Sequence, residues 1–456
     1  MKRKTKGSNE AAPHDTENPP TPLATLMKEE LNRLSPLSSS CCIYRVPTRL
    51  RDVKEKAYSP RVVSIGPFHH GQKALKAMEE HQMRYLQDFL RRTNVSMEDL
   101  VKRISDQEAR VRSCYAETIK FSVDEFVRII LVDATFVIEI FLKIRFPEFL
   151  DENDRVFKRT FQEIWSDLCM LENQLPFFIL EDLFDLHETQ VSFNSDHTER
   201  LSLITLSHLY FEKLMKIEGT EGSLQRICSS KVEHFVDLRR KLYLPCSFES
   251  QAGGQLQTVT TPSITELQTA GVKFNVASTP NLFDIRFADG TLEIPRFNIG
   301  PQTEVRIRNL IAFEQCHCKD NLINDYVVIM DRFVNTAKDV ELLVKYGIVE
   351  NMLGDSNAAS TMINNLADGA TLNYNDFYFA ALCEELNKYR SSTWHRRKAN
   401  LRQNYFNTPW AAISVAAAVF SPRTHCHTNS VLYHLCFLSI IYSKPLHHPF
   451  FSILML

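Results

Sequence analysis

The side chains best suited to chemistry are the adjacent His69 and His70, because imidazole groups bind metal ions and exchange protons near neutral pH. The pair follows Gly66 and Pro67, a dipeptide typical of turns. Neighbouring side chains of an extended segment point to opposite sides, so the two rings do not readily reach one ion. We therefore interpret the pair as structural, with one ring hydrogen-bonded to nearby backbone, and metal or acid–base chemistry as the alternative.

Clusters of cysteine and histidine could bind zinc, but their spacing in this chain does not fit a zinc ribbon or finger. The three clusters are Cys41-Cys42, Cys316-His317-Cys318 and His425-Cys426-His427. The chain has 11 cysteines, an odd number, and its N-terminal stretch does not resemble a secretory signal peptide. We therefore expect free thiols in a reducing cytosolic environment, and neither a metal nor a cofactor.

Motifs of the common enzyme classes are missing from the sequence. It lacks a phosphate-binding loop that ends in Lys-Ser or Lys-Thr, a His-Glu-x-x-His motif and a Gly-x-Ser-x-Gly motif. The net charge of -2 argues against a dedicated nucleic-acid binder, which normally carries a basic surface. We therefore expect no catalytic residues and no nucleic-acid partner, with an enzyme whose site is assembled from distant residues as the alternative.

Three polar residues lie where apolar side chains dominate. Asp133 falls on the apolar face of a helix predicted over residues 122–146, and a buried carboxylate is costly unless it is paired. We interpret it as a polar lock against an arginine or a helix N-terminus, with a proton-handling acid as the alternative. Glu172 and Asn173 precede Pro176, which must end or kink a helix because proline has no N–H. We expect both to bind backbone groups that the broken helix leaves free.

The elements that must position these residues are mainly helices. Helical periodicity is present over 73–92, 122–146, 155–169, 201–217 and 231–243, and it returns between 304 and 389. Residues 42–50 and 61–65 are predicted to be extended. Alternating apolar and polar residues predict strands over 272–276, 282–287 and 291–295. The predicted fold class is therefore mainly α, a multi-helix body with a small antiparallel β insertion.

The length of 456 residues exceeds the usual size of a single hydrophobic core. The first 40 residues are rich in proline and polar side chains, and we predict a disordered leader there. The predicted parts that follow are an N-terminal helical part (41–250), a loop with the small sheet (251–303), a C-terminal helical part (304–400) and a membrane-proximal segment with the tail (401–456).

Six sequence blocks, in order along the chain, are typical of one plant family. They are IYRVP (43–47), VSIGPFHHG (63–71), MLENQLPFF (170–178), HFVDL (234–238), AGVKF (270–274) and LIAFEQ (310–315). Over about residues 42–419 the chain resembles the family called domain of unknown function 247, also named uncharacterised protein family 0481. Each block alone is a weak signal, but six in order are specific.

The resemblance implies a largely helical plant protein that is usually tethered to a membrane by one helix near its C-terminus. Some grass relatives are implicated in self-incompatibility, the recognition between pollen and stigma. No enzymatic activity or catalytic residue set is established for the family. The expectation is therefore a non-enzymatic interaction protein on the cytoplasmic side of a membrane, most often the plasma membrane, with protein partners of unknown identity. A structural membrane-associated scaffold is a further alternative.

The C-terminal region departs from the family pattern. Its candidate anchor residues are Pro409, Trp410, Ile413, Val415, Val419 and Phe420. The apolar run 409–420 is shorter than the ~20 residues that a spanning helix needs, and Ser421 and Pro422 end it. Our hypothesis is that an altered reading frame or a retained intron replaced the tail after Val419. The alternatives are a segment that lies in the membrane surface and a soluble cytoplasmic product.

Overall fold

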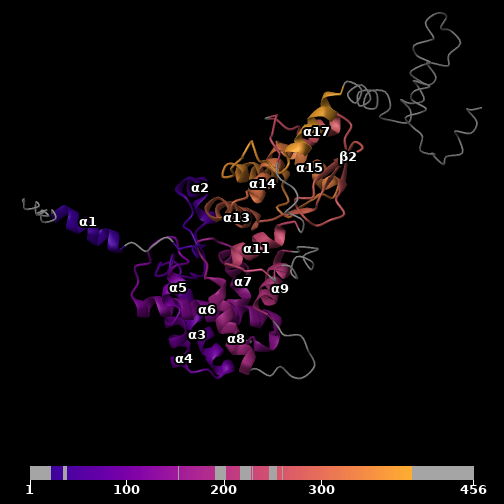
Figure 1. Ribbon diagram of the computed structural model, residues 1–456. Coiled ribbons are helices and arrows are strands. Elements are labelled where there is room, and N and C mark those ends of the chain that lie inside the picture. The colour runs from indigo at the N-terminus through magenta and orange to yellow at the C-terminus, as the bar shows by residue number, and fades with distance from the viewer. Residues whose placement is uncertain are drawn as a thin grey trace, which may run out of the picture.

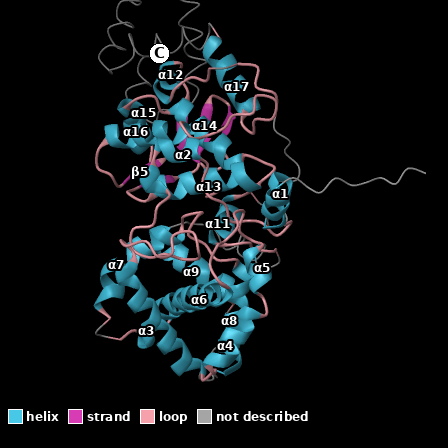
Figure 2. Ribbon diagram, turned by 90° about the vertical axis from the view of Figure 1, so that its left-hand side faces the viewer, coloured by secondary structure: helices cyan, strands magenta, loops and turns pink. Residues whose placement is uncertain are grey.

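The computed structural model describes residues 22–33, 38–151, 154–190, 202–215, 227, 230–245, 254–258 and 260–392. In these residues the fold is mainly α with a small β component, which confirms the predicted class. Figures 1 and 2 show two lobes, one above the other. The N-terminal lobe is helical, and the C-terminal lobe contains helices and all the named strands.

The N-terminal lobe is a group of helices packed around one central helix. Its helices are α3 (Lys76–Thr93), α4 (Met97–Ser105), α5 (Glu108–Arg112), α6 (Val123–Arg145), α7 (Arg155–Leu168), α8 (Phe177–Gln190) and α9 (Leu203–Met215), with the short 3-10 turn η2 (Pro147–Phe149) after α6. Ser122 starts α6 as its cap, since its Oγ accepts the N–H of Glu125 at 3.2 Å. A helix that is apolar on nearly all sides must be buried. Accordingly, α6 packs against α3, α4, α8 and α9 in the middle of the lobe (Figure 2).

The C-terminal lobe combines helices with two small sheets. Its helices are α12 (Ile264–Thr269), α13 (Thr303–His317), α14 (Leu322–Phe333), α15 (Ala337–Lys345), α16 (Ser356–Ala367) and α17 (Ala380–Ser391). One sheet has the order β1-β3-β2, and the other pairs β4 with β5 in parallel; the strands are β1 (Lys273–Val276), β2 (Arg286–Ala288), β3 (Thr291–Ile294), β4 (Phe297–Ile299) and β5 (Val349–Asn351).

The three-stranded sheet is mixed, whereas the sequence predicted an antiparallel one. Strands β2 and β3 form the predicted antiparallel hairpin, and Asp289 and Gly290 between them have φ angles of 50° and 74°. Strand β1 instead pairs with the other edge of β3 in parallel. The difference arises because the connection between β1 and β2 carries the chain across the sheet, so that β3 lies between them.

One long N-terminal segment connects the two lobes, and we call residues 42–71 the N-terminal strap. It contains α2 (Thr48–Val53) and the 3-10 turn η1 (Glu55–Ala57), which packs against α13. The prediction of an extended chain over 42–50 is therefore wrong from Thr48 onward: Pro47 is the N-cap of a helix that follows it. Residues 61–65 have no strand partner in the part of the chain that the structure describes. Helix α11 (Phe235–Tyr243) also lies between the lobes, packed against α13 (Figure 1).

A helix is present inside the segment for which the sequence predicted a disordered leader. This helix, α1 (Pro22–Arg33), stands apart from the two lobes in Figure 1. Its apolar side chains are spaced as on one helical face and are exposed to solvent: Leu23, Leu26, Met27 and Leu31. The prediction missed the helix because its proline and polar neighbours outweighed twelve residues of weak periodicity. The rest of the predicted leader up to residue 21 lies outside the described residues.

Candidate functional site

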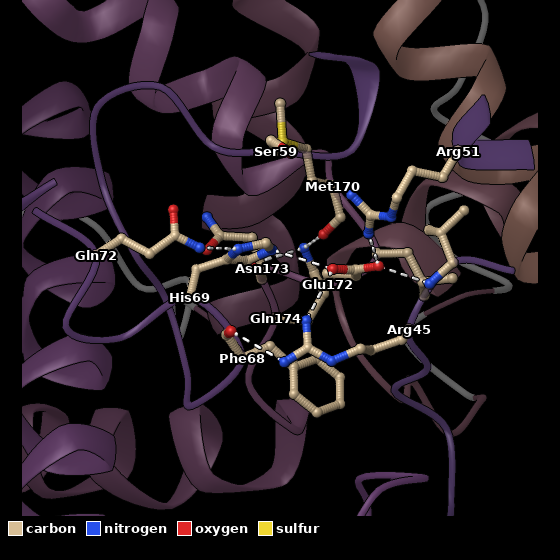
Figure 3. A network of polar contacts seen from close by, with 12 residues as sticks. Arg45, Arg51, Ser59, Phe68, His69, Gln72, Met170, Glu172, Asn173 and Gln174 are labelled. Atoms are coloured by element: carbon tan, nitrogen blue, oxygen red, sulfur yellow. Dashed lines mark hydrogen bonds and ion pairs between the residues drawn. The ribbon is translucent and has the colours of Figure 1, made fainter. Parts of the chain in front are cut away.

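The proline-containing segment forms a turn between two helices. Helix α7 ends at Leu168 and α8 begins at Phe177, directly after Pro176, so the helix break that the proline predicts is present. We call residues 169–176 the elbow. Three consecutive polar side chains of the elbow, Glu172, Asn173 and Gln174, are buried, with exposures of 1%, 0% and 0%. All three bond to groups outside the elbow, and Figure 3 shows the contacts around Glu172.

Asn173 connects the elbow to the strap through its side-chain amide. Its Oδ1 accepts the N–H of Ile65 at 2.8 Å, and its Nδ2 donates to the carbonyl oxygens of Val63 and Asp167, both at 3.1 Å. The amide thus serves as the partner that a neighbouring strand would provide. This explains why residues 61–65, with a strand-like composition, need no strand beside them.

Gln174 holds the end of α7 and the start of α11. Its Nε2 donates to the carbonyl oxygens of Leu168 and Met170, both at 2.8 Å. Its Oε1 accepts the N–H of Phe235, the first residue of α11, at 3.0 Å. Free carbonyls at the end of one helix and a free N–H at the start of another are thereby satisfied by one side chain. Gln174 was not predicted as a site residue, although its position beside Asn173 was a usable signal.

Glu172 also bonds to the strap, at positions nearer its two ends. Its carboxylate accepts the backbone N–H of Val46 at 2.6 Å and pairs with Arg51 and, at 3.4 Å, with Arg45. The Nε2 of His69 lies 3.2 Å from the same carboxylate (Figure 3). Burial raises the pKa of Glu172, but the contacts with His69, the Val46 amide and Arg51 outweigh burial and hold the pKa below its usual value. Glu172 is therefore a buried anion that is surrounded by hydrogen-bond donors from the strap.

Two further carboxylates bind backbone amides of the strap. Asp167, near the end of α7, accepts the N–H groups of Arg61, Val62 and Val63 at 2.8 to 3.1 Å. Burial raises its pKa to about 6, and these hydrogen bonds act in the opposite direction. Asp167 was not predicted as a site residue, because an acid near the end of an amphipathic helix is ordinary in sequence.

Asp133 of α6 has partners that differ from the predicted arginine or helix N-terminus. Its Oδ2 accepts the N–H of Gly66 at 2.8 Å, and its Oδ1 accepts Nε2 of Gln82 at 2.7 Å. Burial raises the pKa of this carboxyl well above its ordinary value. Gly66 has a φ of +77°, and a Cβ there would lie 2.6 Å from the carbonyl oxygen of Gln174. The strap and the elbow therefore meet at a glycine.

The C-terminal lobe joins the same network through α13. Asn309 accepts the N–H of Leu171 at 2.9 Å and donates to the carbonyl of Ala57 at 2.8 Å. A second link is formed by Glu314, which pairs with Arg240 of α11 at 2.9 Å. Neither Asn309 nor Glu314 was predicted from the sequence. We call Asp133, Asp167, Glu172, Asn173, Gln174 and Asn309 the junction residues.

The two histidines of the strap have separate surroundings. His69 is buried, and its Nδ1 accepts Nε2 of Gln72 at 2.8 Å while the other ring nitrogen faces Glu172. Its partners are thus side chains, whereas the sequence predicted backbone. His70 is half-buried with its ring edge-on to Phe121, and burial lowers its pKa. Within the described ranges no three His, Cys, Asp or Glu side chains are grouped so that they could hold a metal ion.

The chemistry that this arrangement supports is the fixing of chain segments. The junction carboxylates and amides are directed at backbone groups from the strap, the elbow, α11 and α13. Buried backbone groups must be paired, and side chains do this here where no regular ladder can. The result is one continuous hydrogen-bonded contact between the two lobes.

The predicted membrane anchor lies outside the described residues. This applies to Pro409, Trp410, Ile413, Val415, Val419 and Phe420. Among the helices of the described ranges, none combines the length and the apolar character that crossing a membrane requires.

Comparison with known proteins supports the resemblance found in the sequence. A family model described as a plant protein of unknown function, domain of unknown function 247, matches residues 43–421. The chain is 28% identical to a UPF0481 protein of Arabidopsis thaliana over 410 residues, which cover 84% of each chain. It is 24% identical to a putative UPF0481 protein of the same plant, with 83% of this chain and 87% of that protein covered. No solved structure matches the chain. The chain therefore belongs to the plant family of domain of unknown function 247.

Proposed function

We propose that the protein is a non-enzymatic interaction protein, a rigid helical body to which partner proteins bind in recognition or signalling. The observation that carries the proposal is the use of the junction residues. These polar side chains are buried, and they bind backbone groups of the same chain. The hydrogen bonds offset the desolvation of the buried polar groups and hold the two lobes in one arrangement.

A fixed arrangement favours binding of other proteins. A surface that is already in its bound conformation loses less conformational entropy when a partner docks. The junction connects segments far apart in sequence, such as Ala57 and Asn309, so a surface built from both lobes keeps its shape. This supports a recognition role better than it supports the movement of one lobe against the other.

The exposed side of α1 provides a place for a partner. Leu23, Leu26 and Leu31 are 64%, 53% and 62% exposed, which is unusual for leucines grouped on one helical face. Amphipathic helices of this kind bind by placing such a face into an apolar groove of another protein. We propose that α1 binds a partner protein in this way.

Membrane association is the second part of the proposal and rests on the sequence alone. The apolar run 409–420 follows the basic residues 395–398, an order suited to attachment at a cytoplasmic membrane surface. Cell fractionation of the full chain beside a version that ends at Thr408 tests this part. The full chain should pellet with membranes and the shortened one should not. Equal distribution of both would remove the membrane from the proposal.

Proximity labelling in plant cells, followed by binding measurements with purified proteins, tests the interaction. The full chain is compared with the double variant Leu26→Asp/Leu31→Asp and with the control Met352→Asp, which changes a 53% exposed apolar residue far from α1 in sequence. We expect one set of neighbours to be lost with the α1 variant only, and the purified neighbour to bind the wild type and the control.

Two results would contradict the proposal. Identical neighbours for the wild type and the α1 variant would remove α1 as the binding element. Turnover of a metabolite by the pure protein, abolished by one polar substitution that leaves the melting temperature unchanged, would show an enzyme instead.

A further inference from the structure

A fully buried arginine between the lobes has no hydrogen-bond partner among the described residues. This is Arg239 of α11, whose side chain is 1% exposed. None of its three nitrogen atoms, Nε, Nη1 and Nη2, bonds to an acceptor in the part of the chain that the structure describes. A guanidinium group carries five N–H donors and stays charged, so its burial in this state is costly.

Two other buried arginines of the same region are paired. Arg308 of α13 is equally buried, and it bonds to Glu304 at 3.0 Å and to the carbonyl of Asn365 at 2.8 Å. Arg240, the next residue after Arg239, bonds to Glu314 at 2.9 Å. The region therefore supplies acceptors for Arg308 and Arg240, whereas Arg239 has none among the described residues.

Aromatic rings lie beside the guanidinium group. The Cζ atom of Arg239 is 5.6 Å from the ring of Trp165 on α7 and 5.6 Å from the ring of Phe211 on α9. Ring faces attract a cation, but they do not accept the N–H groups that point outward in the plane of the guanidinium. The rings hold the cation in place and leave its donors available.

Further donors without partners lie on the helices that surround Arg239. They are Nε1 of Trp165, Oη of Tyr210 on α9 and Nε of Arg306 on α13. Cys169 lies near two of the cations: burial raises the pKa of its thiol to about 11, and the charges of Arg239 and Arg306 act to lower that pKa. Arg239 is therefore a buried cation whose N–H groups, like the donors on the adjoining helices, have no acceptor among the described residues.

We propose that Arg239 is the centre of a buried binding site for a small oxyanion, either a phosphate group or a carboxylate. A group of donors without acceptors is completed by an anion, and an oxyanion matches the planar fork of a guanidinium with two parallel hydrogen bonds. The rings of Trp165 and Phe211 form apolar walls beside it. The site lies where α7, α9, α11 and α13 meet, so a bound anion joins the two lobes.

The test is thermal denaturation of the purified full chain at constant ionic strength. Sodium chloride is replaced stepwise by sodium phosphate in one series and by sodium acetate in another. Because a ligand of the folded state stabilises it by mass action, we expect the melting temperature to rise by about 3 °C at roughly 100 times the dissociation constant. A rise in phosphate alone assigns the site to a phosphate group, and a rise in acetate alone assigns it to a carboxylate.

Two variants and a control separate the site from general salt effects. Arg239→Met removes the charge and keeps the length, and it should abolish the response without lowering the melting temperature in chloride, since the unpaired buried charge is gone. Arg239→Lys keeps the charge without the fork and should respond more weakly. Arg84→Met, at a 60% exposed side chain, should respond like the wild type.

The proposal has clear contrary outcomes. An equal response of the wild type and Arg239→Met would overturn it, and so would a wild type that responds to neither anion. If Arg239→Met does not fold, titration calorimetry of phosphate and acetate into the wild type and Arg239→Lys replaces the comparison. Equal affinity of those two proteins, or no binding heat in the wild type, would then refute the site.

Discussion

Replacement of Asn173 by alanine tests whether the junction stabilises the fold. The substitution removes the partner of the Ile65 N–H and of the Val63 carbonyl. The third partner, the Asp167 carbonyl, keeps a hydrogen bond from Met170 N–H at 3.2 Å. Two buried backbone groups are thus left unpaired, at about 1–3 kcal/mol each. The free energy of unfolding should fall by roughly 4 kcal/mol.

The change is measured as a melting temperature by scanning calorimetry. An unfolding entropy of about 2.1 cal/mol/K per residue amounts to about 1 kcal/mol/K for a chain of 456 residues, so Asn173→Ala should melt about 4 °C lower. Asn173→Asp has the same shape but presents an oxygen to the carbonyls of Val63 and Asp167, so it should melt lower still. The control is Asn357→Ala, at an exposed position near the start of α16, and we expect it to change the melting temperature by less than about 1 °C.

The refuting result is a melting temperature of Asn173→Ala equal to that of the wild type. The junction would then contribute no stability, and its hydrogen bonds would not explain why the polar groups are buried. An unchanged melting temperature together with lost partner binding would assign Asn173 to recognition instead.

Three further predictions concern the same junction and the C-terminal lobe. Gly66→Ala should lower the melting temperature far more than Gly71→Ala: both have positive φ, at a backbone cost of about 1–2 kcal/mol, but only the Cβ at position 66 meets backbone, 2.6 Å from the Gln174 oxygen. Burial raises the pKa of Asp325 to about 7, so the wild type loses stability as pH rises from about 4 to about 7. Asp325→Asn should therefore have a higher melting temperature than the wild type at pH 8 and the same melting temperature near pH 4. An equal difference at both pH values would contradict this. Glu172 has a lowered pKa, so Glu172→Gln should melt lower than the wild type at pH 7, and the deficit should shrink below about pH 4 as the wild-type carboxylate becomes protonated; denaturation curves across pH check both.

Local patterns in the sequence predicted the elements that depend on neighbours in the chain. The start of the helix predicted over 122–146 and the break before Pro176 follow from side chains within a few residues, and the structure contains both. The start of α2 after Pro47 was missed, because a proline that disfavours helix before it is also suited to begin one. The parallel pairing of β1 depends on how the chain crosses the sheet, which strand composition does not record.

The junction was predictable in part. Asp133, Glu172 and Asn173 stood out because polar groups within apolar segments need partners. Their partners could not be identified from the sequence. The backbone N–H that Asp133 accepts belongs to Gly66, 67 positions away, and every residue except proline has such a group. Asp167 lies near the end of the amphipathic helix α7, and Asn309 lies within α13 among both polar and apolar residues. Only the tertiary arrangement distinguishes them from solvent-facing residues.

The distance in sequence between the strap and its partners has a consequence for synthesis on the ribosome. Asp167 and Asn173 follow Val63 and Ile65 by about a hundred residues. Val63 and Ile65 therefore leave the ribosome before their partners have been synthesised. At ~5–20 residues per second the strap waits on the order of ten seconds without its partners. Its α13 contact through Asn309 waits longer still, because 252 positions separate Asn309 from Ala57. Codon changes that slow translation before residue 167 lengthen this interval, and they should reduce the yield of folded protein.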